Sequence, residues 1–198
     1  MNSPQCESND IFGLNGVGEE QLLHPHFERW HEWIINQYEP LLNKIAVFIP
    51  CAAIKPYYNS PIHKAFNPII DRFPTHKIVI SNAGIIPYEF ADCYPFSCYD
   101  WNPAYETDEI KERYIEVTFH RLNNYLKAHG TAYTGFVSYL HPNSSSLKAL
   151  REACNFESIH LHTVEIEDIA LSPTSDSDLV LAHPTNIERL RYLLEELL

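Results

Sequence analysis

Short, uninterrupted apolar runs constrain the fold of this chain more than any other feature. Residues 44–51 (KIAVFIPC) and 77–81 (KIVIS) lack the alternation of a half-exposed strand. Runs of this kind are typical of strands that helices cover on both faces, as in parallel sheets. Residues 132–140 and 158–164 are further strand candidates. The runs therefore predict the buried centre of a mainly parallel sheet.

Amphipathic segments separate these runs. From residue 24 to residue 38, apolar and aromatic side chains recur every three to four positions, and Pro40 follows, which predicts a helix that ends before the proline. Further helices are expected at residues 108–129, 144–154 and 185–198, with a partly helical stretch at 61–72. This alternation predicts a single α/β domain over residues 21–198, with helices flanking the sheet. The polar residues 1–20 are expected to form a flexible arm.

Two segments depart from the alternation. Residues 83–105 are rich in proline and aromatic residues and show no clear period, which is typical of a long functional loop. Residues 179–182 form a short, strand-like apolar piece before the last helix.

The charge balance limits the partners of the chain. Its 198 residues carry 14 Lys and Arg against 26 Asp and Glu, a formal net charge of −12. Such an acidic chain is poorly suited to hold nucleic acid unaided. The 11 histidines make the charge sensitive to pH near 6.5.

The compartment is also constrained by the sequence. We find no apolar run long enough for a membrane span and no signal peptide, so a cytoplasmic location is expected. The five cysteines are odd in number and irregularly spaced, which disfavours a disulfide framework. Neither Cys93 with Cys98 nor His160 with His162 has the spacing and companions of a zinc site, so we expect no metal and no cofactor.

Chemistry-bearing side chains concentrate after the predicted strands. In open α/β sheets, ligands bind beyond the carboxyl ends of the strands. Three loops leave such ends, at residues 50–63, 81–89 and 141–146, and we expect them to converge on one cleft. The first loop combines a thiol, an amine, a phenol, a hydroxyl and an imidazole, at Cys51, Lys55, Tyr57, Ser60 and His63.

This first loop also carries a family signature. Its sequence, PCAAIKPYYNSPIH, resembles the PCxxxKPYxxSxxH signature of archaeosine synthase, an archaeal tRNA-modifying enzyme related to the tRNA-guanine transglycosylases. Residues 78–100 are similar to a second block of that family, so the resemblance covers about residues 44–101. It implies a uracil-DNA glycosylase-like fold, in which residues 55–57 (KPY) replace Asp-Pro-Tyr and residues 141–144 (HPNS) resemble the His-Pro-Ser loop.

The resemblance implies attack of an amine, with free lysine as donor, on the nitrile of 7-cyano-7-deazaguanine in tRNA. We hypothesise that Cys51 forms a transient thioimidate, that Lys55 favours the thiolate, and that His63 or Tyr57 protonates the nitrogen. In a non-covalent alternative, Lys55 and Ser60 anchor the base or a phosphate and Cys51 only packs at the strand end.

Other candidate residues concern substrate binding. Tyr57 could stack on a base, or be buried with its hydroxyl satisfied. Asn82 follows a strand end, beside Gly84, which favours a tight turn. His141 could contact a phosphate or the base. For His63, a helix cap or a core hydrogen bond is the alternative to catalysis.

Two other functions are left open. The C-terminal tRNA-binding module of the family is expected to be absent, so the chain could be a non-catalytic subunit that docks on a separately encoded transglycosylase or RNA-binding partner. A base glycosylase is disfavoured, because the Lys55 ammonium would oppose a cationic sugar. The loop at residues 50–64 has no carboxylate. We therefore expect a tRNA substrate, held with help from a basic or RNA-binding partner.

Overall fold

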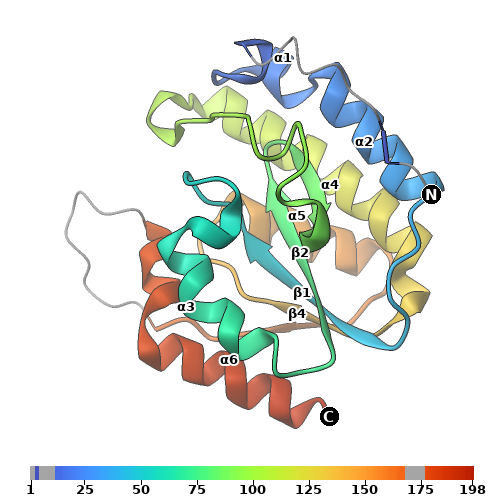
Figure 1. The fold of residues 1–198 in the computed structure, drawn as a ribbon, viewed down its shortest axis with the longest axis vertical. Helices are drawn as coiled ribbons and strands as arrows, with labels where there is room; N and C mark the ends of the chain where they lie inside the picture. Colours follow the sequence, from blue (N-terminus) through green and yellow to red (C-terminus); the bar gives the residue numbers. More distant parts are fainter. Residues whose placement is uncertain (1–2, 5–11, 168–176) are drawn as a thin grey trace.

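The computed structural model describes residues 3–4, 12–167 and 177–198, and its five strands form one sheet in the order β3-β2-β1-β4-β5 (Figure 1). The strands are β1 (Lys44–Pro50), β2 (Thr75–Ser81), β3 (Gly84–Pro87), β4 (Tyr133–Ser138) and β5 (Leu161–Thr163). Strand β1 pairs in parallel with β2 and β4, and β5 continues in parallel beside β4. Only β3 runs antiparallel, against β2. The predicted α/β domain with a mainly parallel sheet is confirmed.

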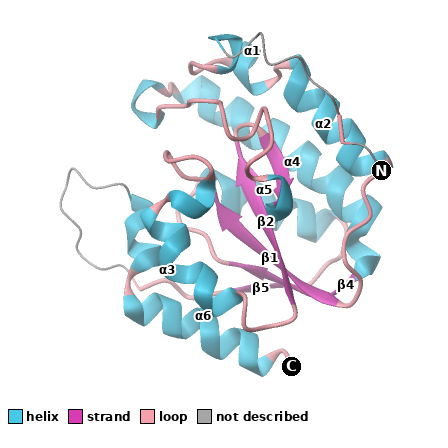
Figure 2. Ribbon diagram, in the orientation of Figure 1, coloured by secondary structure: helices cyan, strands magenta, loops and turns pink. Residues whose placement is uncertain are grey.

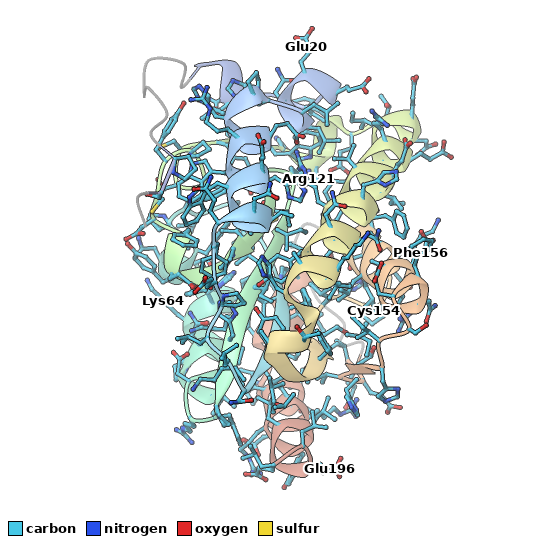
Figure 3. All side chains as sticks on the ribbon, turned by 90° about the vertical axis from the view of Figure 1, so that its right-hand side faces the viewer. Glu20, Lys64, Arg121, Cys154, Phe156 and Glu196 are labelled. Carbon is cyan, nitrogen blue, oxygen red and sulfur yellow. The ribbon has the colours of Figure 1, made fainter. Side chains whose placement is uncertain are left out.

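Helices cover both faces of the sheet (Figure 2). They are α1 (Glu19–Leu22), α2 (Pro25–Asn36), α3 (Pro61–Ile70), α4 (Asp108–His129), α5 (Ser145–Phe156) and α6 (Pro184–Glu196). Helices α3 and α6 pack together on one face, and α2, α4 and α5 lie side by side on the face seen in Figure 3. None of the helices in the described ranges has the length and apolar character that crossing a bilayer requires.

The apolar run that begins at residue 44 is buried because β1 lies at the centre of the sheet. Every residue from Ile45 to Pro50 is buried, and Val47 and Phe48 expose no surface. Leaving a valine or phenylalanine side chain in water instead costs about 1.5–3 kcal/mol each. This burial fixes where β1 ends and therefore where Cys51 emerges.

Side-chain caps set the starts of three helices close to that edge of the sheet. Ser60, Thr107 and Ser144 each accept a hydrogen bond from the backbone amide three residues ahead, at 3.2–3.3 Å. A cap of this kind typically contributes about 1 kcal/mol. The caps hold α3, α4 and α5 with their N-termini directed towards the carboxyl ends of the strands.

Two segment predictions were wrong. Within the stretch predicted as an irregular loop, residues 84–87 form β3, which pairs with β2 through a turn at residues 82–83. Gly84 has φ +141°, a backbone conformation that favours glycine. Residues 179–182 lie in a 3₁₀ helix, Ser177–Ala182, packed against α3 and α6. Val180 and Leu181 are buried in this packing, while Leu179 and Ala182 are half-buried, so an apolar piece of this length is covered without forming a strand.

Part of the expected N-terminal arm lies outside the described residues. The described stretch from residue 12 to residue 20 packs on the domain. Leu14 is buried, and Asn15 forms a parallel bridge with Asp100.

Candidate functional site

A cavity of about 670 Å³ lies at the carboxyl end of the parallel strands. All three predicted loops contribute to it: the first through Cys51 and Lys55, the second through Asn82, and the third through residues 144–146. The remaining wall comes from residues 99–106, from the first turns of α4 and from residues 177–178, and it includes Tyr99, Trp101, Glu106, Lys111, Tyr114 and Asp178. The loops therefore converge on one cleft, as expected from the sheet topology.

A second cavity, of about 500 Å³, lies between residues 17–19 and the start of α4. Carboxylates dominate its lining, and its one cation, Arg113, already pairs with Glu19 and Glu116. None of the predicted site residues lines it. The chemistry-bearing groups thus lie in the larger cavity.

Cys51 and Lys55 are held together at the end of β1. Both are half-buried, and the Lys55 Nζ lies 3.9 Å from the centroid of the Tyr99 ring. Burial lowers the pKa of Lys55, while the nearby Cys51 and Asp100 act in the opposite direction. An amine with a lowered pKa gives up its proton more readily at neutral pH, which suits proton transfer.

The predicted residue Tyr57 lies behind this amine and does not line the cavity. Tyr57 is fully buried, and its hydroxyl lies 2.9 Å from that of Tyr99. Burial raises the pKa of both phenols, so both stay protonated. Tyr57 therefore fixes the Tyr99 ring under the Lys55 ammonium, and it is placed to support the site rather than to stack on a base.

His63 is also buried behind the cavity and does not line it. Its Nε2–H donates to the Pro50 carbonyl at 3.0 Å, and its Nδ1 lies 3.1 Å from the Tyr88 hydroxyl. Burial lowers the pKa of His63 to about 4, so the imidazole is neutral at physiological pH. With both nitrogens engaged and no exposed surface, His63 holds the backbone next to Cys51 and has no direct path to a ligand.

Asn82 is positioned by the unforeseen hairpin between β2 and β3. Its side chain lines the cavity with only 9% of the residue exposed, and its amide makes no hydrogen bond with any residue that the structure describes. The amide atoms of Asn82 are not among the buried polar atoms that lack a partner, so water or a ligand in the cavity can reach them. Asn82 is therefore a polar group available to a bound molecule.

Arg121 on α4 holds Asn82 in place and was not foreseen. It is only 3% exposed, between α2 and α4 in Figure 3. Its guanidinium donates to the Asn82 carbonyl at 3.2 Å, the Leu22 carbonyl at 2.7 Å and the Glu28 carboxylate at 2.6 Å. An arginine on the buried face of an amphipathic helix was the available sequence signal.

Two predicted binding residues lie outside the cavity lining. Ser60 is buried and caps α3, and the Nδ1 of His141 accepts a hydrogen bond from the Asn143 amide at 3.2 Å within its own loop. Instead, polar pairs that sequence reasoning missed shape the wall. Trp101 Nε1 donates to Glu106 at 2.7 Å, and the hydroxyls of Tyr114 and Ser146 lie 2.6 Å apart.

Metal-ligand side chains do not cluster in the part of the chain that the structure describes. No group of three or more His, Cys, Asp or Glu residues there could hold a metal ion. His160 and His162 lie close, with ring centroids 4.4 Å apart, but without a third ligand. Cys51, Cys93, Cys98 and Cys154 form no disulfide among the described residues.

Sequence comparisons find archaeosine synthases among the relatives of this chain. It is 29% identical over 136 residues to "Archaeosine synthase subunit alpha" of Thermoplasma acidophilum, covering 64% of this chain and 24% of that protein. It is 26% identical over 112 residues to "Archaeosine synthase" of Haloferax volcanii, covering 52% and 19%. The chain thus spans about a fifth to a quarter of the length of these relatives. The homology is weak but consistent.

A solved structure supports the fold. The crystal structure of AF0587, a protein of unknown function, superposes with a TM-score of 0.58 at 17% identity, over 84% of this chain and 49% of that one. At this identity the likeness concerns the fold alone. The family described as "Domain of unknown function (DUF5591)" matches residues 27–180, which contain the whole predicted signature and most of the cavity, and the chain belongs to that family.

Proposed function

We propose that this chain is the nitrile-reactive core of a tRNA-modifying enzyme in archaeosine biosynthesis. Its reaction would join the amine of lysine to a 7-cyano-7-deazaguanine base in tRNA. The observation that carries the proposal is the meeting of a thiol, an amine of lowered pKa and a cavity-lining amide in one cavity, at Cys51, Lys55 and Asn82. The archaeosine synthases among the relatives support the choice of substrate.

The cavity suits a purine-like base. Its volume, about 670 Å³, is within the usual range for small-molecule sites. The guanine-type edge of the substrate presents a carbonyl acceptor beside an N–H donor. The Asn82 amide offers a donor and an acceptor side by side, so it can pair with that edge. Asn82 would then orient the nitrile towards the end of β1, where Cys51 lies.

In the first step, the Cys51 thiolate attacks the nitrile carbon. A C–S bond forms, one π bond of the nitrile becomes a lone pair on nitrogen, and that nitrogen takes a proton from the Lys55 ammonium. The product is a thioimidate on Cys51, with Lys55 left as a neutral amine. The lowered pKa of Lys55 makes this proton transfer easier.

In the second step, the amine of the co-substrate lysine attacks the thioimidate carbon. A C–N bond forms, the C–S bond breaks, and Cys51 leaves as a thiolate. The surplus proton of the attacking amine returns to Lys55. The product is an amidine, and both enzyme groups regain their starting states. Lys55 serves here as the proton donor in place of His63 or Tyr57, because those two groups are buried outside the cavity.

The non-catalytic alternative receives support from the comparisons. The chain spans only part of its relatives, and the one from Thermoplasma acidophilum is named as a subunit. In that case, this domain would bind the base while a transglycosylase or RNA-binding partner performs the reaction.

We also propose a fold relationship and a location for the chain. The loop at residues 141–144 supports a relationship of the fold to that of the uracil-DNA glycosylases. We further propose that the chain works in the cytoplasm.

The test uses tRNA that carries the nitrile base, free lysine and the full chain, followed by mass analysis of the nucleosides. Wild-type protein should add one lysine mass to the base. Cys51→Ser should abolish this product, while Cys98→Ser, a thiol outside the cavity lining, should retain it. Product formation by Cys51→Ser at the wild-type rate would refute the covalent mechanism. If the chain is inactive alone but restores activity to a transglycosylase subunit, and Cys51→Ser does so equally well, the non-catalytic function is correct.

A further inference from the structure

A groove adjoins the proposed base cavity along α5. It has a volume of about 390 Å³ and shares Ser144 and Ser145 with the cavity. Beyond these serines, Lys148, Arg151, Glu152 and Asn155 line it. Residues spaced by three or four positions lie on one face of a helix. The groove therefore leads from the mouth of the cavity along one exposed face of α5.

The groove carries two cations that are not neutralised. Lys148 and Arg151 are exposed, and neither forms an ion pair with a residue in the described ranges. Some basic side chains elsewhere are paired with carboxylates, as Lys77 and Arg113 are, and others are unpaired but lie outside the two cavities and the groove, as Lys64, Arg72 and Lys127 do within the described part of the chain. Glu152 is the one carboxylate among the groove residues. On a chain of net charge −12, adjacent cations left unpaired beside the site favour an anionic ligand.

The start of α5 adds to this local field. Ser144 caps the helix by accepting from the Leu147 amide, whereas the amides of Ser145 and Ser146 have no acceptor within the helix. Both serines line the base cavity, and the positive end of the helix lies where the groove and the cavity meet. Lys148 and Arg151 extend the same positive potential along the helix.

We propose that this groove binds the phosphodiester backbone of RNA next to the base that occupies the cavity. The proposal rests on the proposed function, because it takes the ligand of the cavity to be a base within an RNA chain. The phosphate of that nucleotide would lie over Ser144 and Ser145, and the adjoining phosphates would contact Lys148 and Arg151. Arginine can hold a phosphate with two parallel hydrogen bonds. Such contacts position a strand without reading its sequence.

This placement reconciles the acidic chain with a nucleic-acid substrate. Affinity for RNA depends on the cations that replace counterions at the phosphates, so a few well-placed side chains can suffice for weak, salt-sensitive binding. The groove supplies two such side chains, Lys148 and Arg151, next to the cavity that would hold the base. The carboxylates Glu106 and Asp178 line the adjoining cavity, so the phosphates would be directed towards Lys148 and Arg151 and away from the cavity itself.

The test compares the full wild-type chain with the double variant Lys148→Ala/Arg151→Ala. The matched control is Arg72→Ala/Lys127→Ala, which removes one exposed lysine and one exposed arginine that form no ion pair within the described part of the chain. The probe is a fluorescent tRNA transcript without the nitrile base, so the result does not depend on the proposed chemistry. Fluorescence anisotropy gives the affinity from about 50 to 200 mM salt.

We expect wild type to bind the transcript at low salt and the groove variant to lose affinity by about tenfold. The slope of log affinity against log salt should fall by about 1.4, for two lost contacts at about 0.7 each. The control should stay within about twofold of wild type. Equal losses in both variants, an unchanged slope, or no binding by wild type at low salt would overturn the proposal. If a poly-glutamate peptide binds as tightly as the transcript, with the same dependence on Lys148 and Arg151, the proposal of an RNA ligand is overturned and the groove binds an acidic protein instead. If the groove variant makes the nitrile-derived product with an unchanged KM for tRNA, the proposed phosphate contacts are refuted, while the proposed reaction on the nitrile base is supported.

Discussion

Replacing Arg121 by methionine should destabilise the protein and disturb the base cavity together. The guanidinium is 3% exposed and donates to two backbone carbonyls, those of Leu22 and Asn82, as well as to Glu28. Methionine fills a similar volume but donates nothing. Both carbonyls would lose a donor, whereas the half-exposed Glu28 can be hydrated by water.

The magnitude follows from these contacts. A buried polar group that loses its partner costs about 1–3 kcal/mol, so two carbonyls cost about 2–6 kcal/mol. The exposed end of the ion pair adds less than about 1 kcal/mol. Methionine offsets part of this cost, because it removes a buried charge and packs well. We therefore expect the free energy of unfolding to fall by about 3 kcal/mol.

Urea denaturation followed by circular dichroism measures this change. With a denaturant slope of about 3 kcal/mol/M, the midpoint should fall by about 1 M. The comparison variant Glu28→Gln keeps the backbone contacts of Arg121 and an acceptor for its guanidinium, so its free energy of unfolding should fall by less than that of Arg121→Met. A midpoint for Arg121→Met within about 0.2 M of wild type would refute the argument that Arg121 fixes the Asn82 turn.

Three further predictions concern the site and its wall. Asn82→Leu should weaken binding of free 7-cyano-7-deazaguanine by about 10- to 100-fold, measured by calorimetry, and unchanged affinity would exclude Asn82 from base recognition. Tyr57→Phe should lower stability by about 1 kcal/mol through loss of the contact with the Tyr99 hydroxyl, and urea midpoints equal to wild type would contradict this. The pKa values of His31 and His63 are lowered by burial from 6.5 to about 4. Between pH 6.5 and pH 4, the unfolded chain therefore binds protons at these two histidines that the folded chain does not bind. The free energy of unfolding should decline as the pH falls through this range, by about 1.4 kcal/mol per pH unit for each histidine. Urea midpoints that are equal at pH 7 and pH 5 would show that these imidazoles are not held neutral.

The regular part of the fold could be predicted because its signals are local. The period of residues 108–129 gave the limits of α4, and the unbroken apolar run from residue 44 gave β1. Strand β3 was missed because its four residues are too few to show a period, and because its pairing depends on the two-residue turn at 82–83. The apolar residues 179–182 were wrongly predicted as strand-like, because an apolar tetrapeptide fits a strand or a 3₁₀ helix equally well.

The site was predictable at the level of loops but less so at the level of side chains. Because ligands bind beyond the carboxyl ends of the strands in open sheets, the loops that carry Cys51, Lys55 and Asn82 could be predicted to meet at one cavity. It could not show that His63 is buried behind the cavity, because that depends on its contacts with Pro50 and Tyr88. Arg121 reaches Asn82 across 39 residues of sequence. Contacts between residues so far apart in the sequence depend on how the elements pack, and the spacing of residue types along the chain does not predict them.

Intact-protein mass spectrometry of the chain with free 7-cyano-7-deazaguanine, in the absence of any amine, tests the central claim most directly. Addition of a thiolate to a nitrile expels no atoms, so wild type should gain the whole mass of the base, and peptide mapping should place it on Cys51. Cys98→Ser should form the same adduct and Cys51→Ser none. The absence of an adduct on wild type at saturating base, or an equal adduct on Cys51→Ser, would contradict the role assigned to Cys51.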